Sequence, residues 1–135
     1  MTLCDAGPLV ALVSDNDPHH TRCVAALDTL PTGGLITTWA CFAEAMYLLA
    51  RGGWLAQDGL WEYLADGLLR LHSSSDAEWQ RMRVLMHRYR DTPMDLADAS
   101  IVAASETLHQ RRVFTVDHHF YIYRQQQGHS FEVVP

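Results

Sequence analysis

The chain has 135 residues, 48% of them hydrophobic, and a formal net charge of −6. This size and apolar content predict one domain, residues 1–135, with a substantial core. All ten basic residues are arginine, and the absence of lysine excludes P-loop phosphate binding and Schiff-base catalysis. No apolar run approaches the roughly 18 residues of a membrane helix. Residues 1–10 lack the basic start and cleavage site of a signal peptide, so we expect a cytoplasmic protein that contacts no membrane.

Strand-like and helix-like patterns alternate along the chain. Thr38 is predicted to cap a helix that Gly52 and Gly53 end, and Asp17 is predicted to cap a helix with Pro18 in its first position. The three cysteines have no paired metal-binding spacing and are expected to be reduced core residues. The predicted strands are residues 2–4, 33–38, 68–73, 111–117 and 129–134. The predicted helices are residues 8–14, 16–31, 38–53, 57–67, 75–91 and 93–108.

Strands separated by helices predict a parallel sheet that is covered on both faces. We therefore expect an α/β fold, a three-layer α/β/α sandwich whose central parallel sheet has four to five short strands. In such sheets, ligands bind beyond the carboxyl ends of the strands. Asp5 follows the strand at residues 2–4, and Asp117 follows the strand that ends at Val116. Both carboxylates are therefore predicted to lie at the functional edge.

Three further carboxylates have no basic neighbour at helical spacing. Glu44 lies in a helix whose other residues, within 39–50, are uncharged. Asp95 and Asp98 share one face of the 93–108 helix, and the apolar residues after Asp98 indicate that this face is buried. Burying like charges raises their pKa values and is strongly unfavourable unless a cation lies between them. Asp95, nearer the helix start, is equally explained as a charge that the helix dipole favours.

A shared hard cation resolves this excess of negative charge. Mg²⁺ and Mn²⁺ prefer carboxylate and water oxygens as ligands. A cluster of this kind leaves coordination positions for phosphate oxygens and for an attacking water. A zinc site is disfavoured, because the side chains of the adjacent pairs His19–His20 and His118–His119 point apart.

Four stretches carry these carboxylates in order: LCDAGPLVAL, TTWACFAEAMYLL, MDLADASIVAAS and VFTVDHHF. Together they resemble the four acidic motifs of the PIN-domain family, from residue 3 to about residue 120. The resemblance implies a ribonuclease that depends on Mg²⁺ or Mn²⁺, similar to the VapC-type toxins of bacterial toxin–antitoxin pairs. Motif by motif, it implies that the catalytic and metal-binding residues are Asp5, Glu44, Asp98 and Asp117.

Further residues and partners follow from the same resemblance. His118 and His119 are either surface turn residues or contacts to RNA. Arg88 and Arg90 belong to a basic cluster that is either a solvated helix face or a contact to the RNA backbone. The expected partners are an RNA substrate, an antitoxin protein that places a helix in a groove, and a second copy of the chain.

Two auxiliary positions and two departures complete the comparison with the family. Asp95 occupies a position that is acidic in many members, and Thr115 matches a small hydroxyl residue that helps to position the metal or its water. Gly7 stands where the family frequently has Ser or Thr, and the lysines that often contact phosphate are absent. The alternative is a catalytically weak or inactive PIN fold that binds RNA or protein. A dehalogenase-type phosphohydrolase is disfavoured, because Gly7 replaces the second aspartate that it needs.

Overall fold

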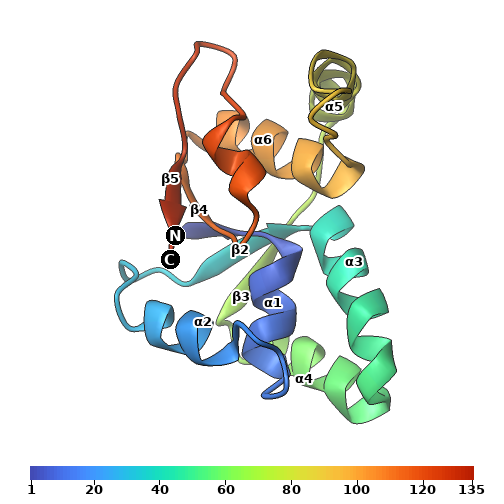
Figure 1. Cartoon of the computed structure of the whole chain (residues 1–135), viewed down its shortest axis with the longest axis vertical. Helices are drawn as coiled ribbons and strands as arrows, with labels where there is room; N and C mark the ends of the chain where they lie inside the picture. The colour runs from blue at the N-terminus through green and yellow to red at the C-terminus, as the bar shows by residue number, and fades with distance from the viewer.

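The computed structural model describes the whole chain, residues 1–135. Its centre is a sheet of five parallel strands in the order β3-β2-β1-β4-β5 (Figure 1). The strands are β1 (Thr2–Cys4), β2 (Leu35–Thr38), β3 (Leu69–His72), β4 (Arg112–Phe114) and β5 (Glu132–Val134). The helices are α1 (Ala6–Val13), α2 (His20–Leu27), α3 (Trp39–Leu49), α4 (Trp54–Ala65), α5 (Asp76–Arg88) and α6 (Leu96–Leu108), with short 3₁₀ turns η1 (Ala50–Gly52) and η2 (His118–Tyr121).

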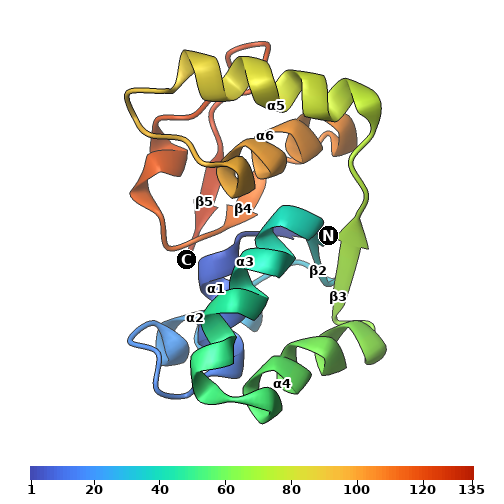
Figure 2. The ribbon, with the colours of Figure 1, turned by 90° about the vertical axis from the view of Figure 1, so that its right-hand side faces the viewer.

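Helices cover both faces of this sheet. Helices α1, α2 and α4 lie on one side and α5 and α6 on the other, as Figure 1 and Figure 2 show from two directions. Helix α3 packs against α1 and also contacts α6. The predicted α/β/α sandwich and its five-stranded parallel sheet are thus confirmed. None of the helices combines the length and apolarity that crossing a membrane requires.

The central strand, β1, places the first predicted carboxylate. Leu3 pairs with Ile36 of β2 and with Val113 of β4, and all three side chains are buried. Such apolar runs are typical of parallel strands that are covered on both faces. The Thr37 hydroxyl donates to the Cys4 carbonyl over 2.7 Å, which joins the carboxyl ends of β2 and β1.

Helix α6 is unusually buried for a helix that begins beside a polar site. Every residue from Ala97 to Ser105 is buried, and the small side chains among them allow α6 to pack closely against α5, β1 and β2. The Ser100 hydroxyl donates to the Ala97 carbonyl over 2.7 Å and lies 2.6 Å from the Thr38 hydroxyl. These bonds fix the first turn of α6 against the carboxyl end of β2.

Two helix starts differ from the prediction. The helix expected at residues 16–31 is shorter and begins at His20. The Asp17 side chain accepts a hydrogen bond from the His19 N–H over 2.8 Å, so Asp17 caps a turn before the helix and leaves Pro18 outside it. The first helix begins at Ala6, directly after Asp5. The three cysteines are free and buried, as predicted.

Candidate metal centre

Three of the predicted carboxylates meet at the carboxyl edge of the sheet. Asp5, Asp98 and Asp117 each offer a ligand oxygen, and these oxygens lie within 4.8 Å of one another. Asp5 follows β1, Asp98 lies in the first turn of α6, and Asp117 precedes η2. The expectation that Asp5 and Asp117 lie at one edge is therefore correct.

The Asp5 carboxylate is held rigidly. Its Oδ1 accepts a hydrogen bond from the Ala6 N–H over 2.8 Å, and its Oδ2 accepts one from the Thr115 hydroxyl over 2.8 Å. The Cys41 Sγ lies 3.6 Å from Oδ1. Thr115 in turn accepts a hydrogen bond from the Asp117 N–H over 3.0 Å. The structure thus places Thr115 between two of the carboxylate residues, where it orients both.

The two aspartates of α6 have different positions. Asp95 is the N-cap of the helix, and its side chain accepts a hydrogen bond from the Asp98 N–H over 2.8 Å. Its side chain is exposed, whereas Asp98 is only 7% exposed. Asp95 therefore has a structural explanation of its own, because a capping carboxylate satisfies a free N–H and interacts favourably with the helix dipole.

Tyr123 is a site residue that the sequence analysis missed. Its hydroxyl donates to Asp98 Oδ2 over 3.0 Å. The ring is fully buried and packs edge-on against Tyr89 and Phe120, at centroid distances of 5.1 and 5.2 Å. No local pattern indicates this contact, because Tyr123 follows η2 in an irregular segment. It orients the Asp98 carboxylate, whereas Asp95 accepts from the Asp98 N–H.

Glu44 reaches the same pocket from α3. The pocket has a volume of about 210 Å³, and its acidic lining residues are Asp5, Glu44, Asp95, Asp98 and Asp117. Glu44 is half-buried and lies outside the cluster of three ligand oxygens. No basic residue lines the pocket, so no arginine neutralises the four carboxylates that converge there with Asp95.

Burial and mutual repulsion raise the pKa values of these acids. Burial and the negative charges of Asp95 and Asp5 together raise the pKa of Asp98 to about 7, and the hydrogen bond from Tyr123 acts in the opposite direction. Burial also raises the pKa of Asp5. Burial and the charge of Asp95 raise the pKa of Glu44. A divalent cation fits this set of donors, because all of them are hard oxygen ligands and all are stabilised by a nearby positive charge.

None of the predicted histidine and arginine contacts lines the acidic pocket. His119 Nδ1 lies 3.0 Å from Asp117 Oδ1, while His118 is exposed. The Arg88 guanidinium lies 5.5 Å from the centroid of the Tyr89 ring. Arg90 Nη1 donates to the carbonyl of His87 over 2.7 Å.

Gly7 is explained by a close packing contact. A Cβ atom at this position would lie 2.8 Å from Val116 Cγ2. Both residues line the acidic pocket. The valine methyl therefore occupies the space into which a serine or threonine side chain would extend.

Replacing Asp98 by asparagine is expected to stabilise the metal-free protein. Because its folded-state pKa is raised from 3.8 to about 7, the folded protein binds more protons than the unfolded chain between these values, and the free energy of unfolding falls as the pH rises through this window. Asp98→Asn removes that loss. In EDTA at about pH 8 it should gain on the order of 2 kcal/mol over wild type in urea denaturation, and much less at about pH 4.

With Mn²⁺ present, wild type should become more stable than Asp98→Asn, because Mn²⁺ stabilises the ionised aspartate and has less affinity for the amide of asparagine. Asp66→Asn, at the exposed end of α4, serves as the matched control and should follow wild type at both pH values. A wild-type protein that is equally or more stable than Asp98→Asn in EDTA at about pH 8 would contradict the repulsion argument.

Gly7→Ala is expected to lower the free energy of unfolding by about 1–3 kcal/mol, because the added methyl overlaps Val116. The second substitution Val116→Ala should recover most of that loss, so that the double variant is more stable than the sum of the two single changes predicts. Urea denaturation of the four proteins measures the coupling. Simple additivity would show that Gly7 is not constrained by Val116.

Comparison with known proteins finds a relative in sequence and solved structures of the same architecture. No family model matches the chain. The chain is 27% identical over 135 residues to ribonuclease VapC26 of Mycobacterium tuberculosis, covering 98% of this chain and 99% of the relative. It superposes on the crystal structure of Mycobacterium tuberculosis VapC20, a toxin described as cleaving the sarcin-ricin loop, with a TM-score of 0.84, 17% identity and full coverage of both chains. The chain is therefore similar in sequence to a VapC-type ribonuclease and similar in fold to a VapC toxin.

Proposed function

We propose that the chain is an endoribonuclease that hydrolyses RNA phosphodiesters with Mg²⁺ or Mn²⁺ held by its acidic pocket. The observation that carries the proposal is the convergence of the Asp5, Asp98 and Asp117 oxygens within 4.8 Å of one another. The full-length similarity to a protein named as a ribonuclease supports the choice of RNA as substrate. An inactive binding module would have no use for this unneutralised cluster.

The residues in and around the pocket have different roles. Asp5, Asp98 and Asp117 hold the cation, and Thr115 and Tyr123 keep two of these carboxylates in place. When bound, the cation offsets the negative charge that builds up on the scissile phosphate and favours ionisation of the attacking water. Glu44, at the side of the pocket, accepts the proton of that water. The new bond from water oxygen to phosphorus forms as the bond from phosphorus to the leaving oxygen breaks.

We also propose that the protein is the toxin of a toxin–antitoxin pair and binds an antitoxin protein. Large apolar side chains are exposed on α3 and α4: Trp39 (51%), Tyr47 (74%), Trp54 (63%) and Leu55 (83%). Exposed apolar side chains in this number are typical of a protein interaction surface. Leu48, on the same helix α3, lines the acidic pocket, so a partner that covers this surface lies close enough to block the site. The same apolar surface would also suit contact with a second copy of the chain.

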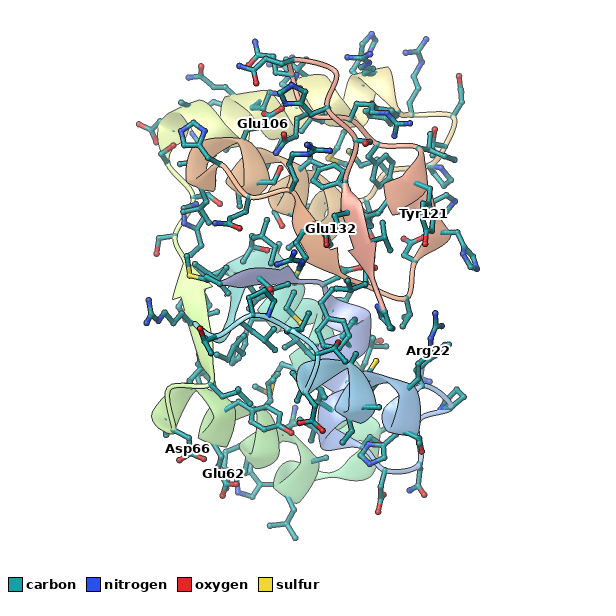
Figure 3. The ribbon with its side chains drawn as sticks, turned by 90° about the vertical axis from the view of Figure 1, so that its left-hand side faces the viewer. Arg22, Glu62, Asp66, Glu106, Tyr121 and Glu132 are labelled. Atoms are coloured by element: carbon teal, nitrogen blue, oxygen red, sulfur yellow. The ribbon has the colours of Figure 1, made fainter.

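Purified protein is expected to cleave RNA with Mn²⁺ or Mg²⁺ and to lose this activity in EDTA. Asp98→Asn should lower the rate at least about 100-fold, because it removes a charged ligand. Asp66→Asn is the matched control, since Asp66 lies outside the acidic pocket at the end of α4 (Figure 3), and it should cleave like wild type. Gel analysis of labelled RNA measures the rates. Cleavage that survives EDTA, or equal rates for Asp98→Asn and wild type, would refute the assigned chemistry.

Induced expression of the wild-type chain in a bacterial host is expected to arrest growth, whereas Asp98→Asn should not. Co-expression of a small protein encoded by an adjacent open reading frame should restore growth if that protein occupies the α3–α4 surface. Growth curves and colony counts provide the measurement. Trp54→Ser, which alters this exposed surface, should retain ribonuclease activity, and co-expression of the small protein should no longer restore growth. Unimpaired growth with an active nuclease would argue for a role in RNA processing instead.

A further inference from the structure

A second, smaller hollow adjoins the acidic pocket. Val116 and Asp117 line both of them. Beyond this shared wall, the second hollow is lined by Arg22, His118 and Tyr121, and its volume is about 60 Å³. A single water needs roughly 10–15 Å³ on this kind of scale. The space therefore suits a small polar group such as a phosphate and is too small for a whole nucleotide.

Arg22 supplies the positive charge that the acidic pocket lacks. It comes from α2, and its Nη2 donates one long hydrogen bond, over 3.5 Å, to an oxygen of Pro135. No aspartate or glutamate forms an ion pair with its guanidinium. Figure 3 shows Arg22 and Tyr121 on the same side of the molecule, from α2 and from η2. Arg22 is exposed, so its remaining donors are free for a ligand.

The three side chains suit different parts of one nucleotide. A guanidinium binds two phosphate oxygens through parallel N–H donors, and the exposed imidazole of His118 supplies a further donor. Tyr121 is 59% exposed, and an exposed aromatic ring at the mouth of a basic hollow is a platform on which an unpaired base stacks. A chain with a net charge of −6 needs such a local cation to bring a polyanion to an acidic site.

We propose that this hollow is a nucleotide subsite for the RNA substrate, next to the scissile phosphate. Arg22 and His118 bind the neighbouring phosphate, and Tyr121 stacks on a base that is unpaired. This inference rests on the proposed ribonuclease function. It specifies that the substrate is single-stranded at the nucleotide beside the cleavage site, because a base inside a duplex cannot stack on a protein side chain.

The test measures RNA binding in the Asp98→Asn protein, in which cleavage is blocked. Fluorescence anisotropy with a labelled single-stranded oligoadenylate of about 12 nucleotides gives Kd across a series of salt concentrations. Arg22→Ala should raise Kd about tenfold and reduce the slope of log Kd against log salt by about 0.7, the loss of one phosphate contact. Arg51→Ala is the matched control, because Arg51 is also exposed and lies in η1. It should change neither quantity.

Tyr121 is tested with two RNAs. Tyr121→Leu should raise Kd several-fold for oligoadenylate and less for oligouridylate, because adenine stacks more strongly, and it should leave the salt slope unchanged. In the active background, Arg22→Ala should raise KM about tenfold and leave kcat within about twofold, since uniform binding is lost. A merely structural role would lower the midpoint of urea denaturation, which these exposed substitutions should not move.

The outcomes separate the subsite from the ribonuclease proposal. In one outcome, wild type cleaves RNA with metal and Asp98→Asn does not, but Arg22→Ala has the same Kd, salt slope and KM as Arg51→Ala. The subsite proposal is then wrong, and the ribonuclease assignment stands. If no metal-dependent cleavage occurs, the ribonuclease proposal fails by its own test. If Arg22→Ala and Tyr121→Leu leave RNA binding intact and instead dissociate a dimer in analytical ultracentrifugation, the hollow belongs to a protein interface and the subsite is overturned.

Discussion

Mutual repulsion between carboxylates at one edge of the sheet is the constraint on which the rest of the structure depends. The fold brings Asp5, Asp98 and Asp117 together and excludes water from two of them, although each loses favourable solvation and faces the charge of the others. Metal-free, the site lowers the stability of the protein. The rest of the molecule must therefore contribute enough favourable packing to hold an arrangement that a bound cation would stabilise further.

The scaffold supplies this stability through neutral donors and small residues. Hydroxyl groups and N–H groups hold the carboxylates: Thr115 donates to Asp5, Tyr123 donates to Asp98, and the Ala6 N–H donates to Asp5, which caps α1. None of these donors carries a charge that would compete with a cation for the site. An arginine or lysine in their place would neutralise the acids permanently and leave no metal site. The absence of basic residues from the pocket is thus as important as the presence of the acids.

The sequence predicts those parts of the site that depend on local order. Asp5 and Asp117 follow apolar strands, and the carboxyl ends of parallel strands meet at one edge, so their proximity follows from topology alone. Asp98 is recognisable because apolar residues follow it at helical spacing. Tyr123 and Arg22 were not recognised, because each reaches the site through the tertiary fold, from an irregular segment and from a helix with no acidic motif. The predicted start of α2 at Asp17 is wrong for a local reason. The Asp17 side chain accepts from the N–H of His19, two residues later, and so caps a turn that precedes the helix.

The pairing of β1 with β4 has a consequence for the cell that makes this protein. Thr115 and Asp5 are hydrogen-bonded in the folded protein but are separated by 110 positions in the chain. The centre of the sheet also requires Leu3 of β1 to pair with Val113 of β4. Contacts between such distant segments form late, after most of the chain has been made. A growing chain attached to a ribosome therefore has no assembled acidic site for most of its synthesis. The topology itself delays the assembly of the acidic site until the segment that contains Thr115 and Asp117 has been synthesised.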